Sequence, residues 1–135
     1  MNKRTLKMLI CDVHERFSAQ LSCLLSRVEF IELVGNTRTY GETASILQFL
    51  EPDIILMDVT ALPDQDPRAI HLIKKQHPGI RIVALTLFQD EIERIDLARF
   101  GFDAAISRVC DLNQITAELK KLYSEPAARS KKLAA

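Results

Sequence analysis

Polar residues that could do chemistry end three apolar runs of this chain. Asp58 closes one run, Thr86 closes another, and Asp12 directly follows a third, Leu6–Cys11. If the runs are parallel strands, their carboxyl ends share one edge of a sheet, and open α/β sheets place their chemistry at that edge. Two carboxylates and a hydroxyl suit a hard cation together with a phosphoryl group. The sequence therefore predicts an active edge built from separate strands.

The elements that must position these residues follow an alternating pattern. Short apolar runs, expected to be strands, occupy 6–11, 30–34, 53–58, 80–86 and 103–107, and amphipathic stretches separate them. Runs that are apolar on both faces are typical of a parallel sheet covered by helices on both sides. The pattern predicts an α/β fold with a doubly wound parallel sheet.

The intervening stretches predict helices with defined ends. In the first of them, apolar residues recur at spacings of three and four and form one stripe: Phe17, Leu21, Leu24, Leu25 and Val28. Thr39–Glu42 and Asp111–Gln114 have the form of capping boxes, and Asp66-Pro67 pairs a capping acid with proline at the first helical position. His77-Pro78-Gly79 should end the third helix, because proline cannot continue it.

Composition narrows the class of protein. The chain has 135 residues, 47% hydrophobic and 27% charged, which is ordinary for one soluble domain. Eighteen basic residues balance eighteen acidic ones, so the domain has no electrostatic reason to contact nucleic acid or a membrane surface. Three cysteines, Cys11, Cys23 and Cys110, lack Cys-x-x-Cys spacing, and no apolar stretch approaches the roughly 20 residues of a membrane span. We expect a reducing, cytoplasmic location.

Two regions of different character divide the chain. Residues 1–123 carry the alternating pattern and form the expected domain, whereas 124–135 lose apolar periodicity and predict a linker or disordered tail. The final Lys-Leu-Ala-Ala also resembles the scar of a cloning junction, which would make this a domain cut from a longer chain. The loop 59–66 is expected to be the most mobile segment near the active edge.

The ordered set of residues resembles the receiver domain of two-component response regulators, from Lys7 to about Tyr123. Receivers carry an acidic pair after strand one, a phosphate-accepting aspartate after strand three, a threonine or serine after strand four and a lysine after strand five. The corresponding residues here are Asp12, Asp58, Thr86 and Arg108. The sequences of segments 9–17, 52–58 and 77–86 are similar to those of the NarL/LuxR-type subfamily, whose receivers precede a helix-turn-helix domain.

The resemblance implies a flavodoxin-like (βα)5 fold with strand order 2-1-3-4-5 and a signalling protein rather than an enzyme. Asp58 would accept a phosphoryl group from a sensor histidine kinase or a small phosphodonor. Asp12, Asp58 and the backbone carbonyl of Thr60 would hold Mg²⁺, and Thr86 would hydrogen-bond the phosphoryl group. The domain would control transcription through self-association, as a homodimer, or through an attached DNA-binding domain.

Four positions depart from the family pattern. Val13 replaces the second acid, Arg108 replaces the lysine, Ala105 replaces the aromatic switch residue, and Pro63 lies one position later than usual. Two hypotheses follow: an atypical receiver that is phosphorylated poorly, or a pseudo-receiver that docks or dimerises constitutively while Arg108 neutralises the acids. A flavin carrier is disfavoured, because the loop after the first strand lacks a glycine-rich phosphate cradle.

Several residues keep two readings. Arg108 is either a catalytic cation or a salt-bridge partner of the acids, and Thr86 is either a switch or a strand-ending β-branched residue. His14, His71 and His77 show no ligand spacing and are expected at the surface or at a helix end. Two apolar stripes would form either core or a partner face: Ile92, Ile95 and Phe100, and Ile115, Leu119 and Leu122.

Overall fold

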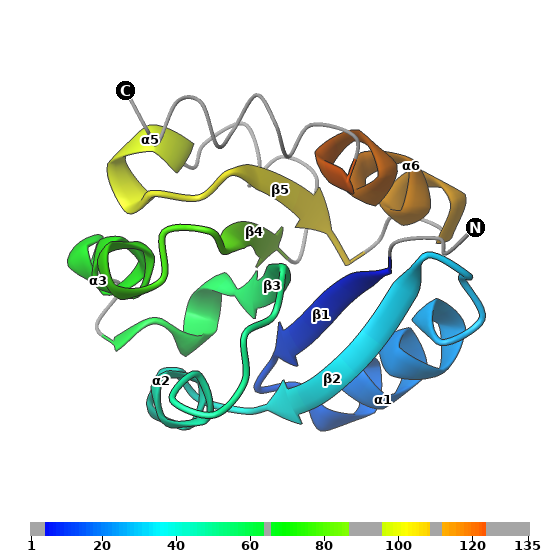
Figure 1. The fold of residues 1–135 in the computed structure, drawn as a ribbon, viewed down its shortest axis with the longest axis horizontal. Helices are drawn as coiled ribbons and strands as arrows, with labels where there is room; N and C mark the ends of the chain where they lie inside the picture. The colour runs from blue at the N-terminus through cyan, green and yellow to red at the C-terminus, as the bar shows by residue number, and fades with distance from the viewer. Residues whose placement is uncertain (1–4, 64–65, 87–95, 109–111, 124–135) are drawn as a thin grey trace.

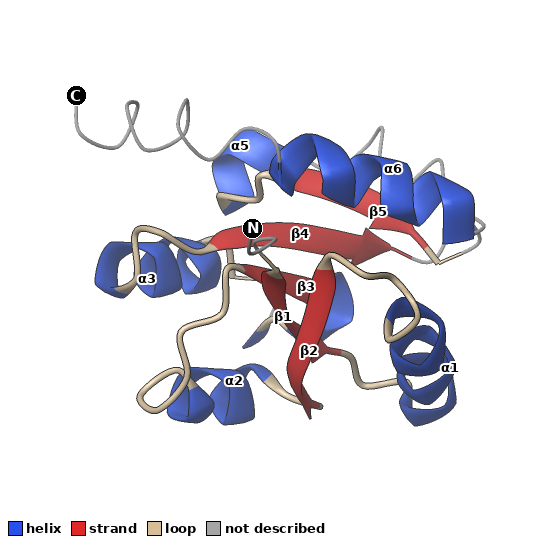
Figure 2. Ribbon diagram, turned by 45° about the vertical axis from the view of Figure 1, so that its right-hand side comes forward, coloured by secondary structure: helices blue, strands red, loops and turns tan. Residues whose placement is uncertain are grey.

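Five parallel strands form one sheet in the order β2-β1-β3-β4-β5, as predicted. The computed structural model describes residues 5–63, 66–86, 96–108 and 112–123. The strands are β1 (Leu6–Cys11), β2 (Ile31–Thr37), β3 (Ile54–Asp58), β4 (Arg81–Thr86) and β5 (Ala104–Ser107). The sheet twists strongly: β2 runs steeply across the view of Figure 2, whereas β4 and β5 are nearly horizontal.

Helices cover both faces of this sheet. The described helices are α1 (Glu15–Leu25), α2 (Tyr40–Ile46), α3 (Arg68–Gln76), α5 (Leu97–Phe100) and α6 (Leu112–Tyr123), with a 3₁₀ turn, η1 (Val59–Ala61), after β3. Figure 1 shows α1 and α6 on one side of the sheet and α2 and α3 on the other. No described helix has both the length and the apolar character needed to cross a membrane.

Two hydrophobic cores follow from this arrangement. One core joins Leu21 and Leu25 of α1 with Ile115 and Leu119 of α6, and the other includes Ala69, Ile70 and Ile73 of α3. Every residue of β3 and β4 is buried. Burial on both faces is what the apolar residues along these two strands predicted.

The second strand differs from its expected bounds. It runs from Ile31 to Thr37, three residues beyond the predicted end, and its pairing with β1 shifts register between Met8 and Leu9. The added residues, Gly35-Asn36-Thr37, escaped the prediction because they are not apolar. Gly35 fits there because a Cβ would lie 3.2 Å from Leu9 Cδ1. The other strands begin and end within one residue of the predicted bounds.

The helix ends agree with the capping signals that fall on described residues. Thr39 and Glu42 form the predicted capping box, and His77 caps the end of α3. The assigned α3 starts at Arg68, but Pro67 already has helical torsion angles and Asp66 Oδ1 accepts from Arg68 N at 2.9 Å. Asp66 therefore caps the helix as expected.

One helix prediction was wrong, and several lie outside the described residues. Leu24 is 39% exposed and does not belong to the buried stripe of α1, whereas Leu21 and Leu25 do. The residues at 17, 21, 25 and 28 define the buried face of the helix, and Leu24 lies at the edge of that face, next to solvent. The Asp111–Gln114 box, Ile92, Ile95, Cys110 and the tail 124–135 involve residues outside the described ranges.

Candidate functional site at the carboxyl edge of the sheet

The predicted site residues gather at the carboxyl edge of the sheet. Asp12 follows β1, Asp58 ends β3, Thr86 ends β4 and Arg108 follows β5. The register aligns these strand ends, because Cys11 pairs with Met57, Asp58 with Leu85, and Thr86 with Ser107. The edge lies at the point where strand order reverses between β1 and β3, the position at which open α/β sheets bind ligands.

Arg108 joins the two acids, which we call the carboxylate pair (Asp12 and Asp58). Its Nη2 donates to Asp12 Oδ1 at 2.6 Å and lies 3.0 Å from Asp58 Oδ2. The Arg108 side chain is 6% exposed and both carboxylates are fully buried. The salt bridge that the sequence left as one of two readings of Arg108 is therefore formed. One guanidinium nitrogen lies between two carboxylate oxygens.

His14 also contacts the carboxylate pair, which the sequence analysis did not anticipate. Its backbone N donates to Asp12 Oδ1 at 2.8 Å, and its Nδ1 lies 3.0 Å from Asp12 Oδ1 and 3.3 Å from Asp58 Oδ2. The side chain is 52% exposed, so the expected surface position holds in part. The sequence signal for this contact is the spacing: in an Asx turn, the aspartate carboxylate accepts a hydrogen bond from the backbone N–H of the residue two positions later.

Hydrogen bonds fix the Asp58 carboxylate. Oδ1 accepts from Thr60 N at 3.0 Å and from Thr60 Oγ1 at 2.8 Å, and Oδ2 accepts from Val13 N at 3.3 Å. Burial alone would raise the pKa of Asp58, but the Thr60 hydrogen bonds and the Arg108 guanidinium outweigh it, so the pKa is lowered. Asp58 is therefore anionic at neutral pH.

The backbone of β4 helps to place Arg108. Arg108 N donates to Thr86 O at 2.8 Å, which continues the β4–β5 pairing by one residue and directs the chain across the edge. Thr86 itself is 1% exposed. Ala105, where receivers carry an aromatic residue, pairs with Ala84 in the sheet and is half-buried.

An aromatic ring lies against the guanidinium. The Arg108 Cζ atom is 5.1 Å from the centroid of the Phe17 ring, within the range of a cation–π contact. Phe17 was expected in the apolar stripe of the first helix, and it also ends the segment 9–17 that resembles the receiver family. Helical spacing reveals a stripe but not which neighbour from another strand lies over its end, so this contact had no sequence signal.

The arrangement does not fit Mg²⁺ while Arg108 holds this position. Asp12, His14 and Asp58 can bring ligand atoms within 4.8 Å of one another, and the buried Asp12 Oδ2 has no hydrogen-bond partner among the described residues. Magnesium, however, requires near-octahedral oxygen ligands at about 2.0–2.1 Å. Val13 supplies no side-chain oxygen, and Arg108 Nη2 already lies between the two carboxylates.

Cys11 lies behind the carboxylate pair as an unreactive thiol. The residue is buried and free, and its burial, with lesser contributions from both aspartates, raises the thiol pKa despite hydrogen bonds with Thr43 and Thr37. Cys11 is therefore a core residue, whose thiolate form is disfavoured.

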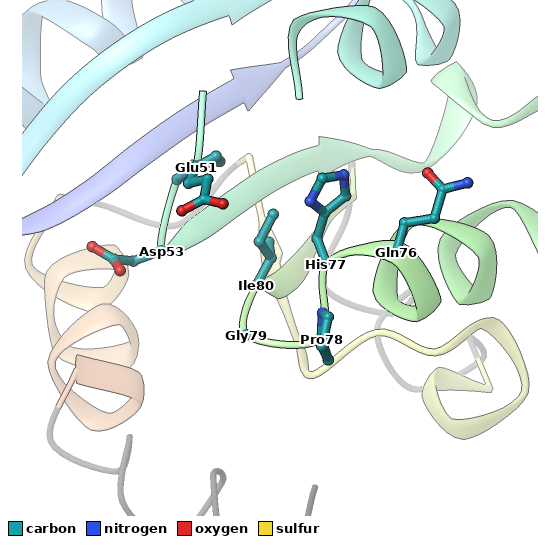
Figure 3. Close-up of a pocket in the computed structure, with 8 residues that line it drawn as sticks. Glu51, Asp53, Gln76, His77, Pro78, Gly79 and Ile80 are labelled. Carbon is teal, nitrogen blue, oxygen red and sulfur yellow. The ribbon is translucent and has the colours of Figure 1, made fainter. Parts of the chain in front are cut away.

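A second hollow lies at the opposite edge of the sheet. It has a volume of about 280 Å³ and is lined by the segments before β3 and β4, residues 51–53 and 76–80. Figure 3 shows Glu51 and Asp53 on one side of this hollow and His77 and Gln76 on the other. It lies at the amino ends of the strands and therefore takes no part in the chemistry of the carboxylate pair.

Comparisons with known proteins point to one family. Residues 8–120 match the family model of the response regulator receiver domain. Response regulator protein VraR of Staphylococcus epidermidis is 31% identical over 118 residues, which are 87% of this chain and 56% of that protein. VraR of Staphylococcus saprophyticus is 28% identical over 119 residues, 88% of this chain and 57% of that protein. The chain thus spans about half the length of the curated relatives it matches.

Solved structures share the fold. A two-component response regulator of the LuxR family from Aurantimonas superposes with a TM-score of 0.78 at 17% identity, covering 96% of both chains. RcsB from Salmonella enterica, bound to promoter rprA in the presence of phosphomimetic BeF3-, superposes with a TM-score of 0.76 at 16% identity, covering 94% of this chain and 67% of that one. At these identities the likeness concerns the fold alone.

Proposed function

Because the chain belongs to the response regulator receiver domain family of two-component signalling, we propose that it is a receiver module in which its own Arg108 serves as the cation of the carboxylate pair and leaves it one negative charge. In this state the module acts through protein association and requires no phosphoryl group. The observation that carries the proposal is the position of Arg108 Nη2, 2.6 Å from Asp12 Oδ1 and 3.0 Å from Asp58 Oδ2.

The physical basis of the proposal is charge neutralisation. Two buried carboxylates repel each other and are costly to desolvate unless a cation lies between them. In receiver domains Mg²⁺ typically provides that cation and also holds the incoming phosphoryl oxygens. Here a guanidinium provides the charge, but it is covalently part of the chain and cannot coordinate carboxylate and phosphoryl oxygens as a metal ion does. A pocket with its own internal cation therefore favours one conformation in the absence of any signal.

Association is the output that fits such a module. Basic and acidic residues balance across the chain, which gives the domain no reason to contact nucleic acid directly. The VraR relatives extend beyond the matched region, so an attached output domain is part of the proposal. The partner is a second copy of the chain or another protein, docked at the edge of the sheet formed by β5, which α5 and α6 flank.

A second candidate function is phosphorylation of Asp58 by a sensor histidine kinase or a small phosphodonor. Two observations favour it: Asp58 has a lowered pKa and is anionic, and the buried Asp12 Oδ2 has no partner among the described residues. If Arg108 moved away from the pair, Asp12, Asp58 and the Thr60 carbonyl would hold Mg²⁺, weakly because position 13 carries no acid. Thr86 would then hydrogen-bond the phosphoryl group.

Intact mass after incubation with a small phosphodonor and Mg²⁺ separates the two functions. We expect no phosphoryl adduct on the wild-type chain and none on Asp58→Asn. The matched variant Arg108→Lys restores the family's residue at that position and tests whether the guanidinium is the obstacle. An adduct on the wild-type chain that disappears in Asp58→Asn would overturn the proposal that Arg108 serves as an internal cation in place of phosphorylation, and it would establish the second candidate.

A further inference from the structure

We infer that Phe17 is a positioning residue: its ring holds the Arg108 guanidinium between Asp12 and Asp58, and it thereby lowers the affinity of the carboxylate pair for divalent cations. The inference rests on the proposed function, in which Arg108 takes the place of a metal ion. It assigns to Phe17 a role beyond filling the core.

Hydrogen bonds alone do not fix the guanidinium. Nη2 contacts both carboxylates, but the buried Nε has no hydrogen-bond partner among the described residues. Within the described part of the chain, the contacts of the guanidinium with the carboxylates are made by Nη2, so the group can rotate about that nitrogen. The Phe17 ring lies 5.1 Å from Cζ and restricts this rotation, because the cation is attracted to the ring face.

The ring is itself well anchored. Phe17 is half-buried on the first turn of α1 and packs against the core that contains Leu21 and Leu25. The same helix is tied to β2, because Ser18 Oγ and Ser22 Oγ both donate to Asn36 Oδ1 at 3.1 Å. The ring therefore has little freedom to follow the guanidinium if Arg108 leaves.

A divalent cation must displace Arg108 to bind the carboxylate pair. When Arg108 is displaced, the chain loses the contact between the guanidinium and the Phe17 ring as well as the two ion pairs. A cation–π contact corresponds to a change in an equilibrium constant of about 2-fold at an exposed position and about 30-fold at a desolvated one. Removing the ring face should tighten cation binding by a factor in that range without any change in the ligands.

The test is a double-mutant cycle with Mn²⁺ as the probe. The free Mn²⁺ fraction is measured by electron paramagnetic resonance for the wild-type chain, Phe17→Leu, Arg108→Gln and the double variant. Phe17→Tyr, which keeps the ring face, is the matched control and should bind Mn²⁺ like the wild type. Circular dichroism checks that each variant folds, and Phe17→Met replaces Phe17→Leu if the latter does not.

The expected result is tighter Mn²⁺ binding in Phe17→Leu by about 2- to 30-fold, still tighter binding in Arg108→Gln, and no added effect of Phe17→Leu in the Arg108→Gln background. If Arg108→Gln binds Mn²⁺ no better than the wild type, the proposed function itself fails. If Arg108→Gln binds better but Phe17→Leu has no effect, or has the same effect in both backgrounds, only the role of Phe17 is overturned.

Discussion

Replacing Arg108 by glutamine should destabilise the fold by about 3–5 kcal/mol, because it leaves two buried carboxylates without a cation. The estimate follows from the geometry: Nη2 lies 2.6 Å and 3.0 Å from oxygens of fully buried side chains. At an effective dielectric constant of about 20, each contact contributes roughly 6 kcal/mol before the cost of desolvation is subtracted. For a domain of this size, the net loss lowers Tm by about 10–20 °C.

Thermal and urea unfolding followed by circular dichroism measure this loss, and Arg68→Gln is the matched control. Arg68 also pairs with an aspartate, with Nη2 2.9 Å from Asp66 Oδ2, but its side chain is 84% exposed. Solvent screens such a pair, so the same substitution there should change stability far less. Comparing the two variants separates burial of an ion pair from loss of an arginine.

The pH dependence of the Arg108→Gln variant gives a further check. Without the guanidinium, repulsion raises the pKa of one member of the carboxylate pair above its value in the unfolded chain. The defect is then small below the unfolded pKa and grows as the pH rises through the raised folded pKa. A loss below about 1 kcal/mol, or one that is the same at every pH, would refute the account of Arg108 as an internal cation.

Three further outcomes are expected. The double variant Val13→Asp, Arg108→Lys should give a phosphoryl adduct on Asp58 by intact mass, because it restores an oxygen ligand and removes the guanidinium. Asp58→Asn should flatten the acid dependence of stability between about pH 5 and 2, measured by urea titration. The folded pKa of Asp58 is lowered, so the stability that its ionised carboxylate contributes is present above the unfolded pKa and is lost as the pH falls through the folded pKa. Gly101→Ala should cost about 1–3 kcal/mol in thermal unfolding, because φ is 85° and a Cβ would lie 3.0 Å from His71 Cε1.

The fold could be predicted because its central strands carry an unambiguous signal. β3 and β4 are buried on both faces, so the residues between their ends are apolar, and such runs alternating with amphipathic stretches are typical of a doubly wound sheet. The end of β2 could not be predicted in the same way. Gly35, Asn36 and Thr37 pair with β1 through backbone hydrogen bonds, which leave no trace in hydropathy.

The site was predictable as a location but not as a network of contacts. Asp12, Asp58, Thr86 and Arg108 all end or follow strands, so topology alone brings them to one edge. Which partner a long arginine side chain chooses depends on rotamers and on neighbours from other elements. The contacts of Arg108 with Phe17, and of His14 with Asp58, join segments whose proximity exists only in the folded chain.

Val13 and Arg108, which both depart from the family pattern, together change the balance of charge at the carboxyl edge of the sheet. A third acid at Val13 would place three carboxylates at this edge, and one guanidinium would leave two negative charges uncompensated, so a divalent cation would be required. With valine there, Arg108 leaves one negative charge, which hydrogen bonds from Thr60 and His14 help to stabilise. Val13→Asp alone should therefore destabilise the chain in metal-free buffer and regain stability when Mg²⁺ is added, whereas equal stability in both buffers would show that the two positions are independent.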